Sequence, residues 1–258
     1  MQRLLKSLFF TLYNLKGSSA LPNASSILLY HSVGENKAFF TVSPDRFARQ
    51  MDILQKSGKS VIFLSELVQK IRNKEDISNN VVLTFEDGYR DTYEMVFPLL
   101  KKFQFKASFF PLIDFIGMSI ETSKGAILDI LTPEQIREMA ASGVCEFLPH
   151  SPHYTRLDDM RYDAAIAEME QQYKNVVSVT KEMPPKIYSY PRGRTSEELV
   201  QYLGAHGWVS AVTLKEGLVY PDTDLFRLPR NAVTSQTSLA EFRGKISCGI
   251  EAYYRFRA

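Results

Sequence analysis

The chain has 258 residues, of which 45% are hydrophobic, and it carries 31 Lys and Arg against 29 Asp and Glu. This length and apolar content are sufficient for one large domain with a sizeable core, and they exclude a wholly disordered chain. A net charge of +2, spread over segments of mixed sign, lacks the dense basic stripe that phosphate backbones require, so no nucleic-acid partner is expected.

The first 16 residues predict an amphipathic helix, because leucines recur at four-residue spacing with basic residues between and beyond them. Such a stripe is typical of a helix on a membrane surface, and a helix packed on its own domain is the alternative. The apolar stretch is too short to span a bilayer, and Lys6, Thr11 and Asn14 interrupt the apolar core that a signal peptide needs. We therefore expect a helix and linker over residues 1–24, with peripheral membrane contact through residues 1–16.

From Ser26 onward, short apolar runs alternate with helical patterns. The predicted strands are 26–30, 60–64, 81–85, 107–111, 144–148, 187–190 and 208–213. The predicted helices are 44–57, 65–74, 92–103, 133–142, 160–181, 195–206 and 238–247. Strands that alternate with helices pair in parallel through crossovers. The mostly apolar strands favour a closed or nearly closed α/β barrel in a single domain, 25–258, with an open doubly wound sheet as the alternative.

In parallel α/β folds the active site forms at the carboxyl ends of the strands. Three of the 4 histidines and a pair of acids follow predicted strands: His31, Glu86, Asp87, His150 and His153. Taken singly, each has an ordinary reading as a buried histidine, a helix-capping acid or a loop residue. Their convergence on one rim of the barrel favours a functional site.

The chemistry of this set points to a metal-dependent hydrolase. Two distant cysteines cannot form a cysteine-rich metal site, whereas two imidazoles and one carboxylate suit an open catalytic one, so Asp87, His150 and His153 are the candidate ligands. Adjacent strand residues point to opposite faces, so Glu86 and Asp87 share the site only if the chain turns at Asp87-Gly88. Glu86 is then free to act as the general base, with His31 as the acid for the leaving group.

With these residues in view, the chain resembles the polysaccharide deacetylases, the NodB-homology group of carbohydrate esterases, and in particular the branch of poly-N-acetylglucosamine de-N-acetylases. The resemblance runs from about Ile27 to Ser247 and is carried by ILLYHSV, LTFEDGYRDTYEMVFPLL, HSPHYTRL, YSYPRG and FRLPRNAV. It implies a distorted (β/α) barrel of about seven strands. It also implies a metal-dependent enzyme that removes acetyl groups from the N-acetylated sugars of a polysaccharide.

The family motif Thr-Phe-Asp-Asp-Gly stands here as Thr84-Phe85-Glu86-Asp87-Gly88. The resemblance makes Glu86 the general base and Asp87 a ligand of a divalent metal, usually Zn²⁺ and in some members Co²⁺ or Ni²⁺. Glutamate in place of aspartate extends the base by one methylene, a shift of about an ångström that matters for a positioned base.

The second family motif has two histidines four residues apart, with a leucine seven after the first. His150 and Leu157 fit it, but Tyr154 occupies the fourth position and His153 falls one residue early. We expect a reshaped loop in which His153 is the ligand, and the alternative is a site that has lost a ligand.

The remaining matches line the groove. Tyr190-Pro191-Arg192-Gly193 matches a wall of the site at which the backbone N–H of Arg192 stabilises the oxyanion. The histidine of Tyr30-His31 matches the catalytic acid, and Arg230 matches a family arginine placed near the base. The resemblance accordingly implies substrate-binding positions at Tyr30, Tyr190, Pro191 and Arg230.

Two rival functions stay open. A catalytically impaired relative that binds glycan or assists polysaccharide assembly is suggested by Glu86 and Tyr154, which stand where the family has Asp and His. A two-carboxylate glycosidase ranks last, because Glu86 offers no recognisable pair with Asp114 or Glu146. In each case the expected partner is a glycan. A location in the cytoplasm or at the inner membrane surface is favoured, and export stays open.

Overall fold

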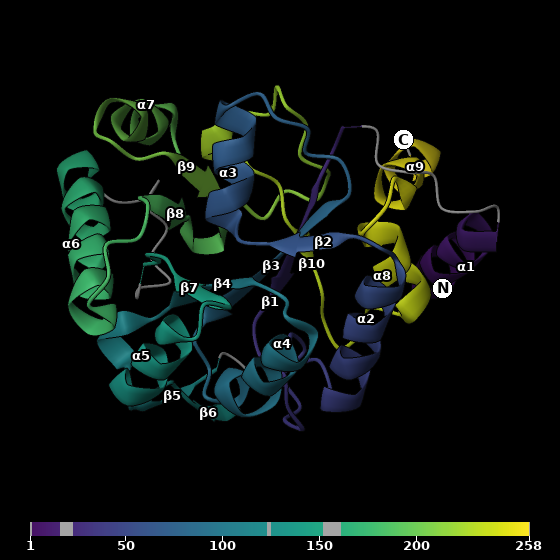
Figure 1. Cartoon of the computed structure of the whole chain (residues 1–258), viewed down its shortest axis with the longest axis horizontal. Helices are drawn as coiled ribbons and strands as arrows, with labels where there is room; N and C mark the ends of the chain where they lie inside the picture. Colours follow the sequence, from purple (N-terminus) through teal and green to yellow (C-terminus); the bar gives the residue numbers. More distant parts are fainter. Residues whose placement is uncertain (1, 16–22, 123–124, 152–160, 258) are drawn as a thin grey trace.

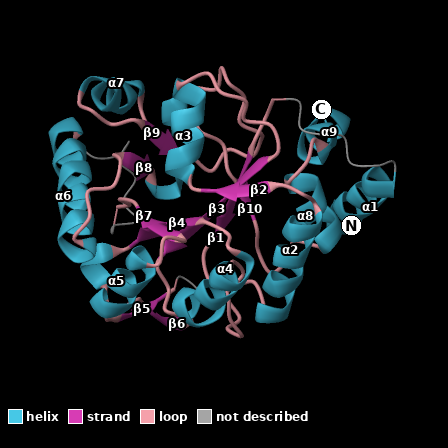
Figure 2. Cartoon of the chain, in the orientation of Figure 1, coloured by secondary structure: helices cyan, strands magenta, loops and turns pink. Residues whose placement is uncertain are grey.

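Helices cover a central set of parallel strands, as Figures 1 and 2 show. The computed structural model describes residues 2–15, 23–122, 125–151 and 161–257. The main sheet has the order β10-β1-β3-β4-β7, β2 pairs with the start of β3, and β8 pairs with β9, all in parallel. The strands of these sheets are β1 Ser26–Tyr30, β2 Ser60–Ile62, β3 Asn80–Asp87, β4 Ala107–Pro111, β7 Cys145–Phe147, β8 Ile187–Ser189, β9 Ser210–Val212 and β10 Asn231–Ala232.

Isolated bridges join the two parallel sheets into a ring. His150, just beyond β7, forms a parallel bridge with Ser189 of β8. Val212 of β9 forms another with Leu228, which precedes β10. The seven strands β1, β3, β4, β7, β8, β9 and β10 thus follow one another around a barrel whose ladder is interrupted at two seams. The predicted α/β barrel is confirmed, and these seams are where it is distorted.

The helices lie on the outside of the strands (Figure 2). Their bounds are α1 Gln2–Leu15, α2 Pro44–Lys56, α3 Leu64–Arg72, α4 Phe97–Phe103, α5 Pro133–Ala141, α6 Tyr162–Thr180, α7 Glu197–Ala205, α8 Leu239–Lys245 and α9 Gly249–Arg257. The helix predicted over 92–103 instead begins with a π-helical turn, Thr92–Val96, closed by a bond from the Phe97 N–H to the Thr92 carbonyl. Pro98 has no N–H and its ring clashes with the carbonyl four residues earlier, which explains the wider turn.

Three strands and one helix were not predicted. The antiparallel hairpin of β5 Ser119–Glu121 and β6 Ile127–Asp129 follows β4, and both of its strands are very short. β10 has only two residues, and α9 ends with largely exposed aromatic and basic side chains. The strands are too short to carry an apolar run, and in α9 the apolar spacing of Ile250, Tyr253 and Tyr254 covers little more than one turn.

Four aromatic rings stack across neighbouring strands of the barrel. Tyr30, Phe85, Phe109 and Phe147 are register partners on β1, β3, β4 and β7, and successive ring centroids are 5.2, 5.0 and 5.4 Å apart. They pack in one core cluster with side chains of the outer helices α2, α4 and α5. Because successive strand residues point to opposite faces, this ladder directs the next residue on β3, Glu86, into the barrel interior.

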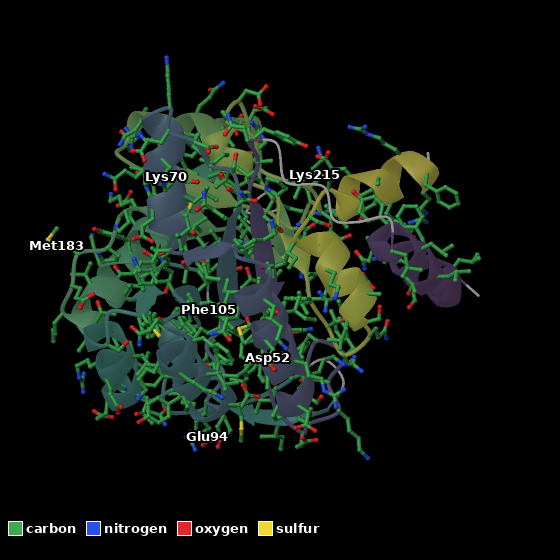
Figure 3. All side chains as sticks on the ribbon, turned by 45° about the vertical axis from the view of Figure 1, so that its right-hand side comes forward. Asp52, Lys70, Glu94, Phe105, Met183 and Lys215 are labelled. Carbon is green, nitrogen blue, oxygen red and sulfur yellow. The ribbon has the colours of Figure 1, made fainter. Side chains whose placement is uncertain are left out.

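The N-terminal helix α1 packs at one edge of the molecule against α8 and α9 (Figures 1 and 3). Phe10 is fully buried in this contact, and a Cβ added to Gly244 of α8 would lie 2.1 Å from the Phe10 ring. A glycine is therefore needed where the two helices meet. The predicted linker lies mostly outside the described residues. Among the helices of the described ranges, none has both the length and the apolar content to cross a membrane.

Candidate active site

Glu86 is the centre of a buried polar cluster at the carboxyl ends of the strands. Its Oε1 accepts hydrogen bonds from Nη2 of Arg230 at 2.6 Å and from Oγ of Ser189 at 2.5 Å. Its other oxygen, Oε2, lies 3.5 Å from Nε2 of His31. One carboxylate oxygen is thus clamped, and the other faces the histidine that follows β1.

The surroundings of Glu86 keep it ionised. Burial raises the pKa of its carboxyl group, but the charges of Arg230, His150 and His31 and the hydrogen bond from Ser189 outweigh burial and lower the pKa to about 2. At neutral pH the carboxylate is therefore in its proton-accepting form.

Arg230 lies beside Glu86, the candidate base, as the resemblance implies, and is fully buried. Its Nε donates to the carbonyl of Thr213 at 2.8 Å, and its guanidinium carbon lies 5.8 Å from the centroid of the Phe110 ring. Its Nη1 has no hydrogen-bond partner among the described residues. A buried guanidinium donor without a partner is unusual, and here it belongs to the residue that holds the candidate base.

The chain turns directly after Glu86, as the sequence predicts. Asp87 and Gly88 have φ values of +67° and +70°. A Cβ at Gly88 would lie 2.8 Å from the Cβ of Pro111, so the turn leaves room for glycine only. Within the described part of the chain, no side chain hydrogen-bonds the Asp87 carboxylate, in contrast to that of Glu86. Asp87 is therefore available to an external ligand.

His150 is buried, and its Nδ1 lies 2.9 Å from the carbonyl oxygen of Ser189. If Nδ1 donates this hydrogen bond, Nε2 keeps its lone pair, which is how a metal-binding imidazole is usually oriented. His153, Tyr154 and Leu157 lie outside the described residues, so the position of His153 stays a prediction. The described residues alone contain no group of three or more His, Cys, Asp or Glu side chains that could hold a metal ion. Asp87 and His150 nonetheless have the donor atoms that two of its ligands would need.

The loop after β1 holds His31 in place. The His31 ring lies 5.3 Å from that of Phe40, and Oγ of Ser32 donates to the carboxylate of Asp91 at 2.5 Å. Burial raises the pKa of Asp91 to about 6, although the hydrogen bond from Ser32 opposes this shift. The loop is thereby tied to the segment that follows β3, which carries Glu86.

The groove wall predicted at residues 190–193 forms a tight turn after β8. The N–H of Gly193 donates to the carbonyl of Tyr190 at 2.8 Å, and Arg192 is exposed with a φ of +54°. A Cβ on Gly193 would lie 2.3 Å from the backbone nitrogen of Leu214, so glycine is required here too. Pro191 is buried behind the turn.

Two of the predicted substrate-binding tyrosines are core residues. Tyr30 has no exposed surface, belongs to the aromatic ladder, and donates its hydroxyl to Oε1 of Gln50 at 3.0 Å. Tyr190 is also fully buried and packs with Tyr188 and Trp208. As described, both side chains shape the site by packing and offer no surface for contact with a substrate.

Ser189 belongs to the site but was not identified from the sequence. It alternates along the chain with Tyr188 and Tyr190, whose rings face the outer cluster. This alternation predicts that Ser189 points inward, but its partner Glu86 is 103 residues away in the chain. The contact therefore depends on the closure of the barrel.

Comparison with known proteins gives consistent matches. The family model described as polysaccharide deacetylase matches residues 73–211. The protein YxkH of Bacillus subtilis (strain 168) is 28% identical over 222 residues, covering 86% of this chain and 75% of the relative. The poly-beta-1,6-N-acetyl-D-glucosamine N-deacetylase of Escherichia coli (strain K12) is 24% identical; the match covers 87% of this chain but only 38% of that enzyme.

Solved structures share the fold. IcaB from Ammonifex degensii matches with a TM-score of 0.76 and 22% identity, covering 86% of this chain and 98% of the other. The deacetylase PplD of Streptococcus pyogenes matches with a TM-score of 0.73 and 22% identity, covering 89% of this chain and 99% of the other.

Proposed function

This chain belongs to the polysaccharide deacetylase family, and we propose that it removes acetyl groups from N-acetylglucosamine units of a polysaccharide. Members of this family hydrolyse the amide C–N bond of N-acetyl sugars, and several relatives are named for poly-β-1,6-N-acetylglucosamine. The observation that carries the proposal is the Glu86 carboxylate, which is buried and ionised, with one oxygen clamped and the other facing His31.

In the proposed reaction, Glu86 removes a proton from the attacking water. Oε1 already accepts two hydrogen bonds, so Oε2 is the oxygen that takes the proton. His31 protonates the amine nitrogen as the C–N bond breaks, and the acetyl group leaves as acetate. The N–H of Arg192, which lies in the turn after β8, stabilises the negative charge on the carbonyl oxygen.

We further propose that the enzyme depends on a divalent metal. Asp87 and His150, with His153 as the predicted third ligand, would hold Zn²⁺, with Co²⁺ or Ni²⁺ as alternatives. When bound, such an ion polarises the amide carbonyl and lowers the pKa of water.

The second candidate is a catalytically impaired relative that binds glycan or assists polysaccharide assembly. It is favoured by Glu86, which stands where the family has Asp and whose Oε1 is clamped by Arg230 and Ser189; this clamp lowers the pKa of the carboxyl group and weakens it as a proton acceptor. This candidate predicts glycan binding without acetate release.

The test is acetate release by the full chain from β-1,6-linked N-acetylglucosamine oligomers, with the metal content of the purified protein measured in parallel. We expect release that is abolished by a chelator, restored by Zn²⁺ and abolished by Asp87→Ala. The matched control is Asp163→Ala, which removes a carboxylate that is 70% exposed at the start of α6. Failure to release acetate from any N-acetylated glycan, in a protein that also retains no metal, would contradict the proposal and support the impaired relative.

A further inference from the structure

A row of leucines on α1 faces away from the domain. The side chains of Leu5, Leu8, Leu12 and Leu15 are 61%, 55%, 54% and 78% exposed. Their spacing of three and four residues places them along one side of the helix. Large apolar side chains gathered on one exposed face indicate an interaction surface, whereas scattered ones do not.

The opposite side of α1 is fixed to the domain, so these leucines cannot turn inward. Phe10 is fully buried, and Nδ2 of Asn14 donates to the carbonyl of Ala240 at 2.9 Å. Nζ of Lys6 lies 2.7 Å from the Glu241 carboxylate. An ordinary surface helix shows its polar side to water. Here polar residues help to hold the helix on the protein, and leucines are left facing solvent.

The neighbouring end of α9 extends this surface and adds positive charge. Phe256 is 76% exposed, and its ring lies 5.2 Å from that of Phe9 in α1. Arg255 is 84% exposed, and Arg257 is exposed as well. Residues 2–15 contain no Asp or Glu. We call the four leucines together with Phe256 the leucine face; its flanking charges are arginines.

We propose that the leucine face docks the protein on a lipid bilayer that contains anionic headgroups. Leucine and phenylalanine side chains enter the boundary between headgroups and acyl chains, while Arg255 and Arg257 pair with anionic headgroups. A second copy of the chain fits this face less well. A two-fold contact would bring the arginines of both copies together; α1 has no acidic side chain, and Glu251 of α9 already pairs with Arg255 of its own copy at 3.9 Å.

The test is flotation of the full chain with vesicles of phosphatidylcholine that contain about 30% phosphatidylglycerol, in low salt. We expect the wild-type protein to float with these vesicles, and much less with pure phosphatidylcholine or in high salt. The double variant Leu8→Glu/Leu12→Glu should lower the partition coefficient by about tenfold or more, because two charges would have to enter the interface.

A matched pair of single variants separates the leucine face from apolar surface in general. Leu15→Glu and Met183→Glu each place one acid at a highly exposed position, 78% and 83% exposed respectively. Met183 lies at the opposite side of the molecule from α1 (Figure 3). We expect Leu15→Glu to weaken flotation and Met183→Glu to leave it unchanged, with thermal melting showing that both variants fold.

Three results would overturn the proposal. The first is a wild-type protein that fails to float with the anionic vesicles, and the second is equal flotation of wild type and Leu8→Glu/Leu12→Glu. The third is a wild-type dimer in light scattering that this double variant converts to a monomer while no vesicle binding is seen, because the face would then belong to a second copy. None of these results depends on acetate release.

Discussion

Two clusters of buried charge stabilise different parts of this molecule. Beneath α1, Nζ of Lys245 lies 2.5 Å from the carboxylate of Glu216 and 3.5 Å from that of Glu241, which also binds Lys6. In the barrel, Arg230 lies 2.6 Å from Glu86. In both places a cation with almost no exposed surface is paired with a carboxylate from a distant segment, Glu216 for Lys245 and Glu86 for Arg230.

The clusters differ in what they leave unpaired. Lys245 has two carboxylates around it, and one of them has a second cation, so the cluster is complete in itself. In the barrel, Nη1 of Arg230 has no partner among the described residues, and Oε2 of Glu86 faces the groove side of the cluster at His31. The comparison teaches that burial of an ion pair alone does not identify a catalytic site. In the barrel, the additional indication is that unpaired atoms belong to a charged pair at the carboxyl ends of the strands.

The largest effect is expected for Glu86→Gln, which removes the proposed proton acceptor and so tests whether the barrel cluster, unlike the Lys245 cluster, is catalytic. We expect acetate release to fall by about 10²–10⁴-fold, the usual contribution of a general base. The control is Glu146→Gln, because Glu146 is a half-buried carboxylate that bonds to Ser65 and Ser108 among the described residues, and burial raises its pKa. An active Glu86→Gln variant would show that the base lies elsewhere.

Arg230→Met tests whether the barrel pair also stabilises the fold. It leaves Glu86 charged and buried, so we expect a loss of about 3–5 kcal/mol in the free energy of unfolding, measured by urea titration at neutral pH. Adding Glu86→Gln should recover most of this stability and none of the activity. A double variant as unstable as Arg230→Met would mean that the arginine acts through packing on Phe110.

Lys245→Met breaks the other cluster. Glu216 is partly exposed and Glu241 keeps its ion pair with Lys6, so some of the lost pairing is compensated, and we expect a smaller loss of about 2–3 kcal/mol. The rate of acetate release per folded molecule should stay unchanged. A lower rate at full folding would indicate that this edge influences the site.

The smallest expected effect is that of Asp91→Asn. The folded-state pKa of Asp91 is raised from 3.8 to about 6, so the folded protein holds this proton more tightly than the unfolded chain. Wild-type stability should therefore fall by about 2 kcal/mol as the pH rises from about 4 to about 6. Asp91→Asn should lack this pH-dependent loss in urea titrations across the same range. If Asp91→Asn showed the same fall in stability between about pH 4 and about pH 6, another group would be responsible for it.

Most of the fold follows from local patterns in the chain. Strands such as β1 and β3 are buried along their whole length, so they read as continuous apolar runs, and the glycines and prolines between them mark the helix ends. β10 escapes prediction because two residues carry no pattern. The orientation of α1 was not predicted either, because residue spacing indicates an apolar stripe but does not indicate which side of the helix packs against the domain.

The site is harder to predict from the sequence than the fold is. Strand ends indicated where Glu86, Asp87 and His150 lie, because parallel strands bring their carboxyl ends to one rim. The clamp on Glu86 needs Ser189 and Arg230, which are 103 and 144 residues away and meet it only when the two parallel sheets come together. Tyr30 was predicted to bind substrate because it stands in a motif beside His31, but its side chain is fully buried and packs in the core.

His150, a candidate metal ligand, also connects the two parallel sheets at the seam between β7 and β8. Its imidazole Nδ1 lies 2.9 Å from the carbonyl oxygen of Ser189, and the N–H of Ser189 donates to the carbonyl of Pro149 at 3.2 Å. A ligand that immobilises this ring would also immobilise the edge of β8. Occupancy of the site and cooperativity of the barrel are then coupled, and amide hydrogen exchange along β8 should slow when the site is filled.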